Sequence, residues 1–136
     1  MSETARNTAT TSASARRAED PDDQISLGVH TASEGRIVVA VGGEVDMLTS
    51  PQLRTVVLEQ LDTAGAELVV LSLDGISFLG TSGLAVLVEM RDAAIAAGVT
   101  LRLACNARRV LRPLTIAGLI PMFDIHDTLG DALAPA

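Results

Sequence analysis

Apolar runs of two different periods alternate along this chain. Residues 37–41 and 68–73 are rich in valine, isoleucine and leucine, as buried strands are. Elsewhere the apolar residues recur every three or four positions, as they do on one face of a helix, for example at Leu53, Val57 and Leu61. Strands that alternate with helices predict an α/β fold, in which helices pack on a mixed, mostly parallel β-sheet.

The expected order is strand, strand, helix, strand, helix, strand, helix, strand and helix. The strands are predicted at residues 25–32, 37–41, 68–73, 99–105 and 121–126, and the helices at residues 50–65, 82–98, 107–118 and 127–133. In the second helix, a buried stripe is expected at Leu84, Leu87, Val88 and Ile95.

Composition limits both the extent of the fold and the nature of its core. Residues 1–24 are small, polar and charged, so they are expected to be a disordered tail. Residues 25–136 are expected to form one folded domain. The chain is 48% hydrophobic but only 1% aromatic, so its core must be aliphatic.

The charge of the chain excludes several classes of function. A formal net charge of −7 argues against a nucleic-acid partner and against an anionic membrane surface, since both bind basic patches. The chain has no Lys, so a Walker A loop and a Schiff-base enzyme are excluded in their usual forms. Cys105 is the single cysteine, which leaves no internal disulfide and fits a cytoplasmic protein. Neither a metal nor a cofactor is expected.

The stretch FLGTSGLAVL, residues 78–87, interrupts an apolar run with two hydroxyl groups. Thr81 and Ser82 lie between Gly80 and Gly83, where a buried strand is predicted to lead into a helix. At that place a serine hydroxyl can cap the free N–H groups of the helix without any further function.

A nucleophilic serine is an alternative interpretation of the same stretch. The hydrolase elbow needs the pattern G-x-S-x-G, and here Leu84 stands where the last glycine would be. Asp124 and His126 could complete a triad with Ser82. Two residues apart in a predicted strand, however, they are expected to point to opposite faces.

Regulatory phosphorylation of Ser82 is the third interpretation. A helix N-terminus carries partial positive charge and unpaired N–H donors, so it tolerates a phosphate. The added charge of about −1.5 to −2 would disturb a docked partner without melting the helix.

Three segments resemble the STAS domains of bacterial anti-anti-sigma factors. They are GGEVDMLTSPQLR at 42–54, LVVLSLDGISFLGTSGLAVL at 68–87, and a C-terminal part at 101–133. The resemblance covers residues 25–133. It implies a STAS-like α/β domain that acts as an anti-sigma factor antagonist and is not an enzyme.

The resemblance also implies partners and sites. Ser82 would be phosphorylated by an anti-sigma factor with a kinase-like ATPase fold, with Thr81 as the alternate acceptor, and a phosphatase would reset it. ATP would belong to the partner. The expected partner interface comprises Asp46, Thr49, Ser50, Gly80, Thr81, Ser82, Gly83 and Leu84, together with Val86 and Met90 as exposed positions of the following helix.

Two positions depart from the family pattern. Gly80 stands where the family usually has Asp. Ser72 stands where the family often has Asp, and in this chain an Asp, Asp74, comes two residues later. A scaffold or sensor subunit that binds a nucleotide or another small ligand is the alternative function, because STAS domains also serve in that way.

Overall fold

A five-stranded sheet forms the centre of the protein in the computed structural model, which describes residues 24–135. The strands are β1 (Ile25–Ser33), β2 (Arg36–Val45), β3 (Leu68–Leu79), β4 (Thr100–Ala104) and β5 (Ile125–His126), and they lie in that order across the sheet. The pair β1–β2 is antiparallel and the other pairs are parallel. The mixed, mostly parallel sheet is therefore confirmed. The expected tail lies, except for Gln24, outside the described residues.

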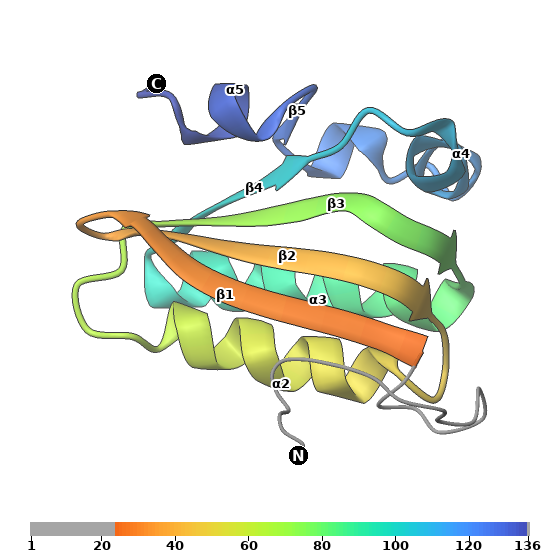
Figure 1. The fold of residues 1–136 in the computed structure, drawn as a ribbon, viewed down its shortest axis with the longest axis horizontal. Helices are drawn as coiled ribbons and strands as arrows, with labels where there is room; N and C mark the ends of the chain where they lie inside the picture. Colours follow the sequence, from red (N-terminus) through yellow and green to blue (C-terminus); the bar gives the residue numbers. More distant parts are fainter. Residues whose placement is uncertain (1–23, 136) are drawn as a thin grey trace, which may run out of the picture.

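Helices cover both faces of the sheet unequally. They are α2 (Ser50–Leu61), α3 (Thr81–Ala97), α4 (Arg108–Ile116) and α5 (Leu129–Leu133), with a 3₁₀ turn, η2 (Ile120–Met122), after α4. Figure 1 shows α2 and α3 side by side along one face of the sheet, with α4 near the arrowhead of β3. The order of strands and helices matches the sequence prediction.

The main core is aliphatic and lies between the sheet and α2, α3 and α4. Alternate residues of β2, such as Val39 and Val41, point into it, because successive side chains of a strand face opposite sides. The side chains of Val110 and Leu114, on α4, pack in the same core. A smaller cluster, in which α5 contributes Ala132, lies apart from this core.

β3 is longer than predicted and runs to Leu79 rather than stopping at residue 73. Its register against β2 shifts twice, so that Ala40 pairs with Ser72 but Val45 pairs with Leu79. Each shift inserts an extra residue into β3, which breaks the alternation of buried and exposed side chains that marks a strand in sequence.

Several element ends, and one helix face, differ from the predictions. α2 ends at Leu61 rather than at residue 65, and the strand predicted at residues 121–126 is only Ile125–His126, because residues 120–122 form η2. α3 begins one residue earlier than predicted, at Thr81, with Gly80 in extended conformation as its N-cap. Ile95, which was expected in the buried stripe of α3, is 64% exposed near the end of the helix.

Candidate functional site

The two motifs of the sequence meet where β2 and β3 end. Val45 pairs with Leu79, and the N–H of Gly80 donates a hydrogen bond of 2.9 Å to the carbonyl of Val45. Because the two strands are parallel, the segments that follow them emerge at the same edge of the sheet. One segment is the loop at residues 46–49 and the other is the start of α3.

Hydrogen bonds within the 46–49 loop hold it in one shape. The Asp46 carboxylate accepts from the N–H groups of Leu48 and Thr49, at 2.9 and 3.1 Å. The Thr49 hydroxyl accepts from the N–H of Asp46 at 2.9 Å and donates to the carbonyl of Glu44 at 2.8 Å. Asp46 therefore organises the loop from within.

Two residues of the expected interface are buried in this loop. Thr49 is fully buried and Ser50 is 6% exposed, because the Thr49 hydroxyl turns back into the loop and Ser50 opens α2. Their side chains offer little surface to a partner, and the expected contact stays a prediction. Their part is to position their neighbours.

Three exposed apolar side chains stand at this edge of the sheet and were missed in the sequence. Met47 is 75% exposed, Leu48 57% and Phe78 54%. Met47 and Leu48 point outward, because the side chains of Asp46 and Thr49 turn inward to bond to the backbone of the loop. Phe78 lies across Gly80, where an added Cβ would come within 3.1 Å of its ring. The signal was present in the Asp46-x-x-Thr49 spacing, since an Asx-type loop presents its middle residues to solvent.

Thr81 and Ser82 occupy the first two positions of α3. Thr81 is exposed and Ser82 is half-buried. No hydrogen bond of the Ser82 hydroxyl is found with any other described residue, and the N-cap is Gly80. Ser82 is therefore not the helix cap that its position suggested, and its hydroxyl is free to react or to bind.

The electrostatic setting of Ser82 favours a negative charge. The first bond of α3 runs from the N–H of Leu84 to the carbonyl of Gly80, at 3.1 Å. The N–H groups of Thr81, Ser82 and Gly83 precede it and have no acceptor within the helix. α3 has 17 residues, so its dipole adds partial positive charge at the same place.

Gly83 allows α3 to start in close contact with the sheet. A Cβ on Gly83 would lie 2.7 Å from both Leu79 Cδ1 and Val45 Cγ1, nearer than real Cβ atoms come. Gly83 is buried, and Leu84 is only 9% exposed. Both residues shape the site from below, and neither offers a broad surface to a partner.

The prediction that Val86 and Met90 are exposed interface positions is wrong. Val86 is 8% exposed and Met90 is fully buried, both in the main core. α3 buries more than one stripe because it packs against α2 as well as against the sheet. The exposed positions between residues 81 and 92 are Thr81, Ala85, Glu89 and Asp92.

Asp74 serves the fold rather than the site. Its carboxylate accepts from the N–H groups of Asn106 and Ala107 at 2.8 and 3.0 Å, at the start of α4. In return, Arg109 donates to the carbonyls of Ile76 and Asp74 at 2.6 and 2.5 Å. These bonds, the β3–α4 bracket, fix α4 to the irregular part of β3.

A hollow of about 450 Å³ lies between the start of α3 and α4. It is lined by Thr81, Leu84, Arg109, Arg112, Pro113, Ile116 and Ala117. No cluster of three or more potential metal ligands exists within residues 24–135, and none of the helices described there is long and apolar enough to cross a membrane.

The groups needed for a hydrolase are engaged elsewhere. The expectation that Asp124 and His126 point to opposite faces is wrong, because residues two apart in an extended chain share a face. His126 Nε2 lies 2.9 Å from Asp124 Oδ1, without hydrogen-bond geometry. The other oxygen of Asp124 lies 3.2 Å from Nε of Arg102. Neither Asp124 nor His126 forms a hydrogen bond with Ser82 in the described part of the chain. Burial, with smaller contributions from nearby carboxylates, raises the pKa of Cys105 to about 11, so this thiol is a poor nucleophile.

Comparison with known proteins identifies a family and several proteins that this chain resembles. The family model described as the STAS domain matches residues 29–132. The chain is 30% identical over 99 residues to the anti-sigma-F factor antagonist RsfB of Mycobacterium tuberculosis, which covers 73% of this chain and 80% of RsfB. An anti-sigma factor antagonist from Mycobacterium paratuberculosis is similar in structure, with 29% identity, a TM-score of 0.72, and coverage of 82% of this chain and 93% of that one.

The unphosphorylated form of the antagonist SpoIIAA shares the fold at 17% identity, with a TM-score of 0.67 over 79% of this chain and 93% of that one. The match of the family model over most of the described residues settles the classification. The chain belongs to the STAS domain family.

Proposed function

We propose that this protein is an anti-sigma factor antagonist, a regulatory protein without catalytic activity of its own. The observation that carries the proposal is the meeting of the 46–49 loop with the start of α3. There, exposed Met47, Leu48 and Phe78 stand at the same edge of the sheet as Thr81 and Ser82. We call these five residues the Ser82 surface.

The chemistry of the Ser82 surface fits a protein partner. Exposed large apolar side chains gathered at one edge mark a docking site more often than a scattered pattern does. The relatives named as anti-sigma factor antagonists, at about 30% identity, support an anti-sigma factor as that partner. We propose that the partner has a kinase-like ATPase fold and that the encounter takes place in the cytoplasm.

Phosphorylation of Ser82 is the proposed switch, with Thr81 as the alternate acceptor. A phosphate at the second position of α3 would meet free N–H groups and a favourable helix dipole, so the fold would remain. The same phosphate would place a charge of about −1.5 to −2 among apolar side chains that must be desolvated on docking. Binding would therefore weaken while stability stays nearly constant, and a phosphatase would restore binding.

The test is affinity capture from a lysate of the native cells, with captured proteins identified by mass spectrometry. Four baits are used: wild type, Ser82→Ala, Ser82→Glu and Ser33→Glu. Ser33 is an exposed residue at the opposite end of β1, so Ser33→Glu adds the same charge away from the Ser82 surface.

We expect wild type, Ser82→Ala and Ser33→Glu to capture an anti-sigma factor with a kinase-like domain, and Ser82→Glu to capture much less. Equal capture by Ser82→Glu and Ser33→Glu would remove Ser82 from the interface. Incubation of the captured partner with ATP should then phosphorylate wild type but not Ser82→Ala. Phosphate on Ser82→Ala that disappears in the Ser82→Ala, Thr81→Ala double variant would move the acceptor to Thr81.

A further inference from the structure

Charge is distributed unevenly along this acidic chain. Residues 93–123 contain four arginines and neither Asp nor Glu, although the net charge of the chain is −7. Residues 19–23, with the sequence EDPDD, hold four carboxylates immediately before the described residues begin. A basic stretch and an acidic stretch of equal and opposite charge therefore occur in one chain.

Two of the four arginines are committed to the fold. Arg102 lies against Asp124 and donates to carbonyls near the C-terminus, and Arg109 belongs to the β3–α4 bracket. Arg108 and Arg112 are exposed, and neither forms an ion pair with a carboxylate of residues 24–135.

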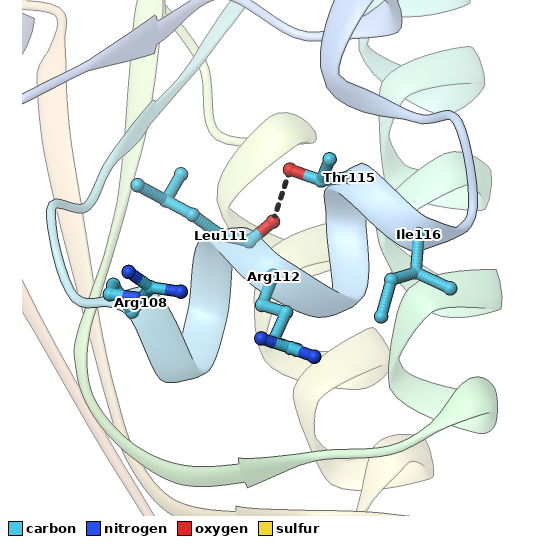
Figure 2. Close-up of a pocket in the computed structure, with 5 residues that line it drawn as sticks. All are labelled: Arg108, Leu111, Arg112, Thr115 and Ile116. Atoms are coloured by element: carbon cyan, nitrogen blue, oxygen red, sulfur yellow. Dashed lines mark hydrogen bonds between the residues drawn. The ribbon is translucent and has the colours of Figure 1, made fainter.

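Arg108 and Arg112 lie one turn apart on the outward side of α4. Figure 2 shows their side chains extending from successive turns, beside a hollow of about 380 Å³ that Leu111, Thr115 and Ile116 complete. Two guanidinium groups at this spacing repel each other mildly. We call the pair, with the hollow between them, the α4 basic stripe.

The acidic segment ends two strands away from a residue to which α4 is bonded. Ile25 pairs with Gly43 in the neighbouring strand, Gly43 pairs with Ile76 in the next, and Ile76 accepts a hydrogen bond from Arg109. Two strand spacings of about 4.8 Å therefore separate the start of β1 from the residue that Arg109 holds. Five extended residues span up to about 17 Å, which covers that distance and the width of an arginine side chain.

We propose that residues 19–23 dock on the α4 basic stripe of their own chain, with their carboxylates paired to Arg108 and Arg112. Single exposed ion pairs are worth little, but this contact joins four carboxylates to two cations at the high effective concentration that a short tether gives. The docked segment lies beside Thr81, because Arg112 also lines the hollow at the start of α3. This inference does not rest on the proposed function.

The test is nuclear magnetic resonance of the full chain. The readout is the guanidinium Nε–H and backbone amide signals of α4, at low ionic strength and again at about 1 M salt, where the Debye length falls to about 3 Å. The acid-neutral variant carries Glu19→Gln, Asp20→Asn, Asp22→Asn and Asp23→Asn. The matched control, Glu59→Gln with Asp62→Asn, neutralises exposed acids on and just after α2.

The docked segment predicts that the acid-neutral variant shifts the Nε–H signals of Arg108 and Arg112, while the signal of Arg54, which is paired with Glu89, stays in place. High salt should produce the same shifts in wild type, and the α2 control should produce none. Arg108→Glu with Arg112→Glu should abolish the response of the α4 amides to residues 19–23. Reversal of the four acids to Arg in that background should restore it.

Signals of α4 that are the same in wild type and in the acid-neutral variant would overturn the proposal. The proposal would also fail if replacing the four acids by Arg in the Arg108→Glu, Arg112→Glu variant left its α4 amide signals unchanged. Arg108 and Arg112 are exposed, so these variants are expected to fold, and the dispersion of the remaining amide signals verifies this in the same spectra.

Discussion

Replacement of Thr49 by Val would test whether a single hydroxyl holds the 46–49 loop. Val keeps the shape of Thr and removes the hydroxyl, which accepts from the N–H of Asp46 and donates to the carbonyl of Glu44. Thr49 itself is fully buried, so water cannot easily take the place of the hydroxyl. The change therefore leaves one backbone donor and one acceptor without a partner.

The structure sets the size of the effect. Each unpaired group costs about 1–1.5 kcal/mol in a half-buried setting, at the lower end of the usual range. The extra buried methyl group returns about 0.8 kcal/mol. The free energy of unfolding of Thr49→Val should fall by about 1–2 kcal/mol, which lowers the urea midpoint by about 0.5–1 M for a protein of this size.

Urea unfolding followed by circular dichroism measures this shift. Thr55→Val is the matched control, because the Thr55 hydroxyl bonds to the carbonyl of Pro51 on the exposed side of α2. The control should lie within about 0.5 kcal/mol of wild type. If Thr49→Val unfolds at the same urea concentration as Thr55→Val, the hydroxyl does not hold the loop and the reasoning fails.

Three further predictions concern the site and the core. Gly83→Ala should lower the free energy of unfolding by about 1–3 kcal/mol, because its Cβ would collide with Leu79 and Val45. The control Gly28→Ala, whose Cβ would have no atom within 4 Å, should not lower it, and equal urea midpoints for the two variants would contradict this. Leu48→Ser should leave stability nearly unchanged but weaken binding of the captured anti-sigma factor about tenfold in calorimetry, and unchanged affinity would exclude Leu48 from the interface. Cys105, whose pKa is raised from 9.0 to about 11, should react with iodoacetamide at pH 8 about 100-fold more slowly in the folded protein than in urea. Since the unfolded thiol ionises first, stability should also fall as pH rises from about 9 towards 11, and Cys105→Ala should lack that part of the slope.

The order of the elements could be predicted because each depends on local periodicity. The helical stripe at Leu53, Val57 and Leu61 is buried as expected, since α2 has one side towards the core. β3 was cut short at residue 73 because register shifts relative to β2 disturb its alternation. A shift of this kind depends on the partner strand and cannot be read from one segment alone.

The candidate site was found in outline but not in detail. The position of Ser82 between a strand and a helix was evident in the sequence, and the resemblance implied that residues of both motifs belong to one interface. The burial of Val86 and Met90 was not, because residues distant in sequence pack against α3. The turn of the Thr49 hydroxyl into its own loop was missed for a different reason, since a side-chain bond of this kind depends on the backbone geometry of the loop.

The β3–α4 bracket has a consequence for how the protein opens. α4 has only nine residues and contains Pro113, so it would hardly persist alone. The helix is stabilised by the Asp74 carboxylate, which accepts a hydrogen bond at its start, and by the hydrogen bond from Arg109 to the carbonyl of Ile76. Amide protons of α4 and of the last part of β3 should therefore exchange with solvent as one cooperative unit. The part of β3 that leads into α3 is thus held by a helix that begins 27 positions after the start of α3.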